Sequence, residues 1–285
     1  MDTSRTLLKH LNDKLNPLGM EVYLFKVSWY NETVRPCFKL PYADNVICAV
    51  VLTVPAFFES AFLPNVENLL AQKQTKDPID ECIAFHLNET VSGLNIGGIT
   101  IMYDYEILPN RRPKVLVQTA AHVAGAAFYY QREHVLKPSV EFNKLEPSSH
   151  CDAAGDRNQN KGHCRDSCNA KEGTSGSIDP WGGKRKIYGV CVHPKYGGWF
   201  AIRAVLVFTE LEDANLTKLE PTDCVKTRTE RIDLLEKFNG NWKDSTYRDV
   251  IQVKEKYSEL QTLYFLTLPK DRMKLLQQIV NNQTV

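Results

Sequence analysis

The run from residue 184 to residue 208, KRKIYGVCVHPKYGGWFAIRAVLVF, constrains the possible folds more than any other part of the chain. It contains two apolar stretches of strand length, separated by a short glycine-containing turn at residues 193–198. A connection this short permits antiparallel pairing and excludes the longer crossover that parallel strands need. The sequence therefore predicts an antiparallel hairpin.

Further apolar runs predict strands near residues 22–29, 46–54 and 99–105. Helices are expected at the N-terminus and at residues 57–72, 78–94, 230–238, 254–265 and 270–280. The expected strands are few, pair with neighbours in the sequence and are surrounded by helices. This pattern predicts an α+β fold built on one antiparallel sheet flanked by helices.

Residues 137–177 differ in composition from the rest of the chain. They are rich in Ser, Gly, Asn and charge and hold almost no large apolar residues, so burial cannot offset the entropy lost on ordering. We expect a low-complexity surface insertion in a core of residues 1–211, followed by helical residues 212–285. Its possible metal ligands are His150, Cys151, His163, Cys164 and Cys168. Their spacing matches no recognised zinc pattern, so no metal site is predicted.

Composition and charge argue against several classes of protein. A formal net charge of +1 gives no electrostatic support for binding nucleic acid or a membrane surface. No apolar run reaches the ~18 residues of a membrane span. The amphipathic N-terminus does not resemble a signal peptide, and Cys48 and Cys191 lie in apolar runs typical of reduced thiols, so a cytoplasmic location is expected. The sequence also lacks the glycine motifs of nucleotide-binding folds and the serine-hydrolase motif.

Polar residues recur at helical spacing after a basic, proline-bracketed turn at residues 110–113. Gln118, His122, Gly125 and Tyr129 occupy positions i, i+4, i+7 and i+11, which lie on one face of a helix. This stripe is a candidate site for a flat polar ligand close to the backbone. The alternative is a core histidine with satisfied hydrogen bonds, beside a glycine that permits close helix packing.

Arg203 is an anomaly within the apolar strand WFAIRAVLVF. Strict alternation places it on the same face as Trp199, Ala201, Val205 and Val207. A guanidinium in such a stripe is costly unless it meets an anion, which is either an internal Asp or Glu or the carboxylate of a ligand. Arg248 and Arg272 could supply further donors, whereas Cys191 is expected to be a small core residue and Asp104 a cap or salt-bridge partner.

Four motifs carry a resemblance to a known family: PNRRPKVLVQTAAHVAGAAFYYQR, DPWG, GVCVHPKYGGWFAIR and TYRD. They closely resemble the CblC family of cobalamin-processing proteins (methylmalonic aciduria and homocystinuria type C), and the similarity extends to about residue 278. The resemblance implies a flavin nitroreductase-like fold with a C-terminal helical cap and a large cavity. The 137–177 insertion departs from the family pattern.

The resemblance also implies a chemistry. Proteins of this family bind base-off cobalamin, in which the dimethylbenzimidazole base is displaced from cobalt. They remove the upper axial ligand by glutathione-dependent dealkylation, or by reductive decyanation with electrons from reduced flavin (FMN or FAD). A CblD-type trafficking protein is the implied partner, and the chain is expected to be a monomer or a ligand-induced dimer. A non-catalytic cobalamin chaperone and a flavin-dependent nitroreductase are the alternatives.

Site residues follow from the resemblance motif by motif. The arginines expected to bind and activate glutathione are Arg203, Arg248 and Arg272. The expected cobalamin contacts are Asp104, Val115, Leu116, Val117, Gln118, Tyr129, Tyr130, Gln131, Cys191 and Ile202, with His122 and Gly189 close by.

Overall fold

A four-stranded antiparallel sheet forms the centre of the protein in a computed structural model, which describes residues 3–71, 77–136, 179–183 and 185–283. The strands are β1 (Met20–Lys26), β2 (Val46–Thr53), β3 (Ile99–Tyr103) and β6 (Ala201–Glu212), in the spatial order β1-β2-β6-β3. All neighbours pair antiparallel. The α+β class with an antiparallel sheet is therefore confirmed.

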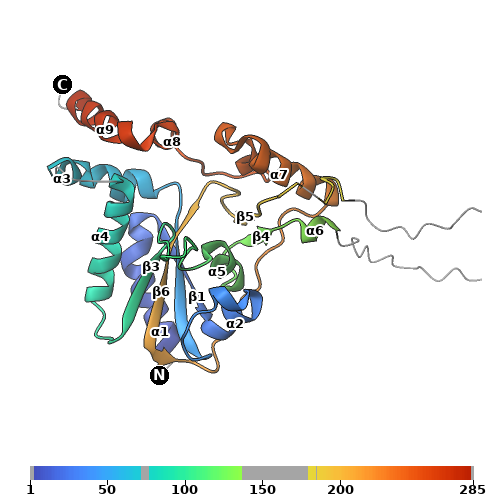
Figure 1. The fold of residues 1–285 in the computed structure, drawn as a ribbon. Helices are drawn as coiled ribbons and strands as arrows, with labels where there is room; N and C mark the ends of the chain where they lie inside the picture. Colours follow the sequence, from blue (N-terminus) through green and yellow to red (C-terminus); the bar gives the residue numbers. More distant parts are fainter. Residues whose placement is uncertain (1–2, 72–76, 137–178, 184, 284–285) are drawn as a thin grey trace, which may run out of the picture.

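Helices cover both faces of this sheet (Figure 1). On one side lie α1 (Thr3–Leu15) and α4 (Pro78–Ser92), which pack apolar side chains against Ala204, Leu206 and Phe208 of β6. On the other side lie α2 (Val27–Thr33) and α5 (Val117–Val123), facing Val205 and Val207. Every residue of β2 is buried because both of its faces are covered, which explains its continuous apolar sequence.

The predicted hairpin is wrong. Its first strand, β5 (Val190–Val192), pairs with β4 (Phe128–Tyr130) in a separate two-stranded sheet. The second strand, β6, has both edges occupied by β2 and β3, so it offers no edge to β5. The turn itself is real, because His193 and Gly197 exchange two backbone hydrogen bonds. The strand predicted at residues 22–29 also ends early, at Lys26, where α2 begins.

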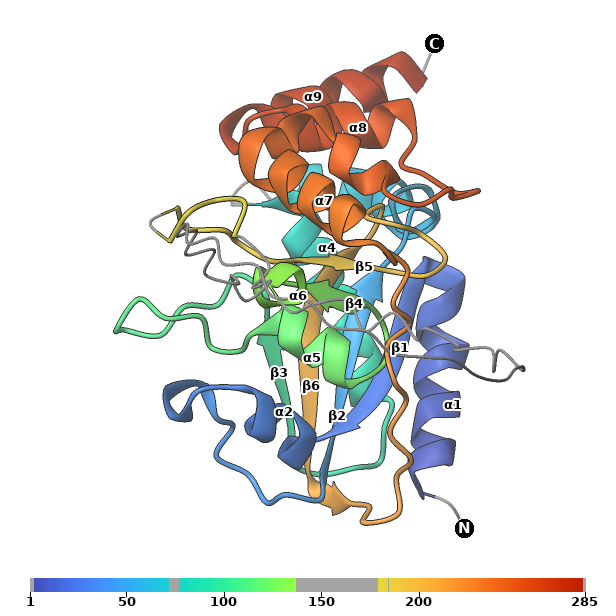
Figure 2. The same ribbon diagram turned by 90° about the vertical axis from the view of Figure 1, so that its right-hand side faces the viewer.

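The C-terminal helices lie across one end of the sheet (Figure 2). They are α7 (Arg228–Asn241), α8 (Glu259–Leu266) and α9 (Pro269–Gln283), close to the predicted ranges except that α8 begins five residues late. Tyr264 of α8 is fully buried against the rings of Phe58 and Phe62.

Shorter helical segments complete the fold. They are α3 (Val66–Ala71), α6 (Glu133–Leu136), a π-helical turn at Phe58–Phe62, and 3-10 turns at Asn16–Leu18, Pro36–Phe38, Leu63–Asn65, Trp242–Asp244 and Thr246–Asp249. No helix of the described ranges is long and apolar enough to cross a membrane.

A polar cluster anchors the 193–197 turn to the edge strand β1. The Glu21 carboxylate accepts hydrogen bonds of 2.7 Å from both Tyr23 and Tyr196, and His193 Nε2 lies 3.5 Å from it. Burial alone would raise the pKa of Glu21, but hydrogen bonds from His193, Tyr23 and Tyr196 outweigh it and lower that pKa to about 2. The ionised carboxylate therefore stabilises the fold above its unfolded pKa, and this stabilisation is lost as pH falls toward the folded value.

We predict that Glu21→Gln lowers the free energy of unfolding by about 2–3 kcal/mol at pH 7. The difference from the parent protein should shrink as the pH is lowered from about 5 toward 2, since both proteins then lack the charge. Urea titrations of both proteins at several pH values measure this, with the exposed Glu32→Gln as control. A pH-independent difference would contradict the account.

Candidate functional site

Two cavities that share one residue, Asp104, lie where the β3 strand ends. The first, which we call the Gln118 cavity, has a volume of 390 Å³. It is lined by Thr33, Val34, Arg35, Phe38, Asp104, Pro113, Val115, Leu116, Val117, Gln118, Thr119, Tyr129 and Gln131. The second, the arginine cavity, has a volume of 340 Å³. It is lined by Asp77, Ile79, Asp80, Asp104, Ala201, Arg203, Trp242, Arg248, Tyr257, Phe265 and Arg272.

The wall of the Gln118 cavity is fixed by hydrogen bonds at the start of α5. The Leu116 amide donates to the hydroxyl of buried Tyr30 at 2.9 Å. The Gln118 side-chain oxygen accepts from the Cys191 amide at 3.0 Å, and the Cys191 thiol faces the Gln118 carbonyl at 3.5 Å. Because its oxygen is bound to β5, the Gln118 amide group is held in one orientation.

The predicted helical stripe does not exist as one face. Helix α5 ends at Val123, and Gly125 adopts a left-handed conformation with φ +77°. A glycine with positive φ commonly terminates a helix in this way. Tyr129 therefore belongs to strand β4, and of the four stripe residues only Gln118 and Tyr129 line the cavity.

His122 supports the cavity from outside its lining. Its Nδ1 accepts a hydrogen bond of 3.2 Å from the Tyr129 amide, and its ring packs edge-on against Phe128. Burial lowers the pKa of His122, which favours the neutral imidazole that this hydrogen bond requires. The geometry thus matches the core-histidine interpretation, and any effect of His122 on a ligand would pass through Tyr129.

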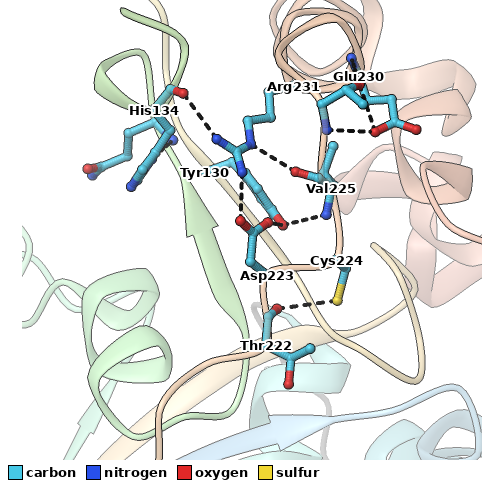
Figure 3. A network of polar contacts seen from close by, with 10 residues as sticks. Tyr130, His134, Thr222, Asp223, Cys224, Val225, Glu230 and Arg231 are labelled. Atoms are coloured by element: carbon cyan, nitrogen blue, oxygen red, sulfur yellow. Dashed lines mark hydrogen bonds and ion pairs between the residues drawn. The ribbon is translucent and has the colours of Figure 1, made fainter. Parts of the chain in front are cut away.

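The hydroxyl group of Tyr130 forms hydrogen bonds with other residues of the protein (Figure 3). It is fully buried, donates to Asp223 at 2.6 Å and accepts from the Val225 amide at 2.7 Å. Arg231 of α7 completes the network by binding Asp223 at 2.6 Å and the carbonyls of Val225 and His134. This network ties β4 to the C-terminal helices, so a contact of Tyr130 with a ligand would involve its main chain.

Three other predicted contacts also lie outside the described cavity lining. Cys191 and Ile202 are buried in the core on the α5 side of the sheet. Burial raises the pKa of the Cys191 thiol, so this group is protonated at neutral pH. Gly189 packs behind Tyr129, and a Cβ atom there would lie 2.6 Å from the Tyr129 ring and 2.7 Å from the Tyr130 carbonyl.

A β-bulge places Arg203 in the arginine cavity. Leu52 pairs with Ile202 while Val51 pairs with Ala204, so Arg203 is an extra residue without a partner on β2. Its Nε lies 3.4 Å from Thr53 Oγ1, and its guanidinium faces α4. Strict alternation predicted that Arg203 shares one face with Ala201, Val205 and Val207. Ala201 does line the same cavity as Arg203, but Val205 and Val207 pack on the other side of the sheet.

Arg203 has internal acidic neighbours, as one of the two interpretations expected. Its Nη1 lies 3.8 Å from Asp80 and 3.8 Å from Asp104. These ion pairs are too long to be hydrogen bonds, so the guanidinium keeps donors for another acceptor. Burial raises the pKa of Asp80 to about 6, with Arg203 opposing the shift and Asp77 and Asp104 adding to it. Burial also raises the pKa of Asp104, again opposed by Arg203.

The other two arginines reach the cavity from the C-terminal segments. Arg272 of α9 donates to Asp77 at 2.6 Å. Arg248 lies under three aromatic rings, with its Cζ 5.0 Å from the Tyr257 centroid, 5.1 Å from Tyr247 and 5.6 Å from Trp199. All three predicted arginines therefore line one cavity.

Glycines of the 193–198 turn hold Arg248 in place. The Gly198 amide donates to the Arg248 carbonyl at 2.9 Å, and Arg248 Nη1 donates back to the Gly198 carbonyl. A Cβ atom at Gly198 would lie 2.7 Å from Arg248 Cα, so only glycine permits this approach. The GGW and TYRD motifs are thus one structural unit.

Two of the acids that line the arginine cavity, Asp77 and Asp80, were not predicted from the sequence. Asp77 caps α4 by accepting from the Ile79 amide, and the Asp77-Pro78 pair is a recognisable helix start. The Asp77-Pro78 pair predicts where the helix begins, but it does not predict that arginines lie close to it in the fold. Among the described residues no group of three possible metal ligands was found, and the five candidates at positions 150–168 lie outside the described residues.

The protein is thus an α+β protein with two cavities of small-molecule size, one lined by apolar and amide side chains and one lined by charged side chains. The sequence matches the family described as "Methylmalonic aciduria and homocystinuria type C family" over residues 19–153 and 161–276. The chain belongs to this family.

Individual relatives agree with the family match. A Gallus gallus protein named "Cyanocobalamin reductase / alkylcobalamin dealkylase" is 43% identical over 268 residues, which is 94% of each chain. The Homo sapiens protein of that name is 42% identical over 270 residues, covering 95% of this chain and 80% of the human protein. A structure described as that of "a C.elegans B12-trafficking protein CblC, a human MMACHC homologue" superposes with a TM-score of 0.74 at 28% identity, covering 96% of this chain and 95% of the other.

We predict that Gly189→Ala displaces the 129–131 wall of the Gln118 cavity and weakens ligand binding there by at least about tenfold. The added methyl group has no space beside Tyr129 and the Tyr130 carbonyl. Gly183→Ala is the matched control, since a Cβ atom at Gly183 meets nothing within 4 Å. Cobalamin titrations of both variants test this. Equal cobalamin affinities of the two variants would show that residues 129–131 can move to accept the added methyl group, and would contradict the prediction.

Proposed function

We propose that this chain binds base-off cobalamin and removes its upper axial ligand, by glutathione-dependent dealkylation of alkylcobalamins and by reductive decyanation of cyanocobalamin. The names of the vertebrate relatives favour this enzyme over the non-catalytic chaperone and nitroreductase alternatives. The observation that supports it most is the position of Asp104, which borders both the Gln118 cavity and the arginine cavity. Two reactants in these cavities would meet at their common border.

The Gln118 cavity has the chemistry that a corrinoid requires. Val115, Leu116 and Val117 offer apolar surface for the ring, and Gln118 and Gln131 offer amides for its amide side chains. Its volume of 390 Å³ accommodates one part of a cobalamin, so the rest would extend past the cavity mouth. No imidazole or thiol belongs to the described lining, which suits a cobalt without a protein ligand on that side.

The arginine cavity has the chemistry that glutathione requires. Glutathione carries two carboxylates, and the planar guanidinium groups of Arg203, Arg248 and Arg272 suit bidentate carboxylate binding. A guanidinium close to the bound sulfur would also lower the pKa of the thiol and favour the thiolate. The thiolate sulfur then attacks the alkyl carbon, the electron pair of the carbon–cobalt bond stays on cobalt, and the products are a thioether and cob(I)alamin. The thiol proton leaves to solvent.

Decyanation needs electrons, and we propose reduced flavin (FMN or FAD) as their source. Reduced flavin enters this proposal as a diffusible donor. The family resemblance supports further parts of the same proposal. These are a flavin nitroreductase-like fold, a C-terminal helical cap at residues 212–285, a cytoplasmic location, a CblD-type partner, and a monomer or ligand-induced dimer.

We predict that Arg203→Ala lowers kcat/KM for methyl transfer from methylcobalamin to glutathione by about 10- to 100-fold or more, since one charge-assisted contact to the thiol substrate is lost. Cobalamin affinity, followed by the shift from the base-on to the base-off absorption band, should change by no more than about twofold. Arg185→Ala removes an exposed arginine outside both cavities and is the control. Unchanged dealkylation by the Arg203 variant would remove this residue from the reaction.

A further inference from the structure

The arginine cavity is not a purely positive pocket. Three carboxylates, those of Asp77, Asp80 and Asp104, line it together with three guanidinium groups. A ligand that carried only negative charges would meet these carboxylates as well as the arginines. Charge of both signs in one cavity favours a ligand that also has both signs.

The three carboxylates differ in how well they are partnered. Asp77 accepts hydrogen bonds from Arg272 and from the Ile79 amide. Backbone amides at residues 104 and 105 lower the pKa of Asp104 and so favour its ionised form. Within the described ranges the Asp80 carboxylate receives no hydrogen bond, and its nearest cationic group, Arg203 Nη1, is 3.8 Å away. Burial raises the pKa of Asp80 to about 6, as expected of a carboxylate whose charge is poorly compensated.

The three arginines also differ in how close an acidic partner lies. Arg272 and Arg203 have acidic neighbours, at 2.6 Å and 3.8 Å. Arg248 has no acidic partner within 4.0 Å in the part of the chain that the structure describes, and its Nη1 donates only to the Gly198 carbonyl. The cavity thus offers one carboxylate and one guanidinium that the protein itself leaves under-partnered, Asp80 and Arg248.

We propose that Asp80 binds the α-ammonium group of the γ-glutamyl residue of glutathione, while Arg248 binds a glutathione carboxylate. The inference rests on the proposed function and deepens it, because it assigns the recognition of the substrate's positive charge. An ammonium group would supply the hydrogen-bond donors that Asp80 lacks, and the bond would be charge-assisted on both sides. Asp80 would then select glutathione over thiols that have carboxylates alone.

The test compares two probes that cannot react, S-methylglutathione and its des-amino analogue, in which a glutaryl group replaces the γ-glutamyl residue. Binding is measured by calorimetry on the full chain loaded with cobalamin. We expect the parent protein to bind the des-amino probe about tenfold more weakly than S-methylglutathione. We expect Asp80→Asn to weaken S-methylglutathione binding about tenfold and to bind the des-amino probe at least as tightly as the parent protein does, since a negative charge is removed.

Glu89→Gln, an exposed carboxylate farther along α4, is the matched control and should behave like the parent protein. Undiminished binding of the des-amino probe by Asp80→Asn also shows that this variant is folded. Equal binding of both probes by the parent protein, or an equal loss of both in Asp80→Asn, overturns the inference. Failure of both probes to bind the parent protein would instead overturn glutathione as the co-substrate, and the assignment of Asp80 with it.

Discussion

The guanidinium of Arg203 lies between the carboxylates of Asp80 and Asp104, 3.8 Å from each, and the arrangement of both cavities depends on this contact. A bulge in β6 turns Arg203 away from the apolar face that alternation predicts and toward α4. A half-buried guanidinium without acidic neighbours would be costly. Carboxylates at hydrogen-bonding distance would instead occupy its donors. The observed spacing neutralises the charge and keeps the donors available to a ligand.

Some residues around the Gln118 cavity line it, and others hold the lining residues in position. Gln118 and Tyr129 belong to the lining, whereas His122 holds the Tyr129 amide from behind and Tyr130 anchors β4 to α7 through Asp223. One sequence motif thus contains both residues that line the cavity and residues that hold those lining residues in position. Substituting a supporting residue would alter ligand binding through packing, without any lost contact to the ligand.

Local pattern predicted the class of fold and most helices, because apolar periodicity and turn residues act over short distances. It failed wherever the outcome depended on distant segments. The pairing of β5 with β4, and of β6 with β2, joins strands far apart in sequence, so a short turn alone suggested the wrong partner. One glycine ended the His122 helix, and one bulge reversed the face of Arg203. The three arginines named by the motif resemblance line one cavity, whereas Asp77 and Asp80 emerged only from the fold.

In the proposed function, a corrinoid in the Gln118 cavity and an anionic thiol in the arginine cavity meet across Asp104. A crystal structure with methylcobalamin and ophthalmic acid, the glutathione analogue with a methyl group in place of the thiol, tests it most directly. We expect the corrin to lie against residues 115–118, a carboxylate of the analogue to bind Arg248 or Arg203, and that methyl group to point at the upper face of cobalt. An analogue bound elsewhere, with Arg203 still between Asp80 and Asp104, would contradict it.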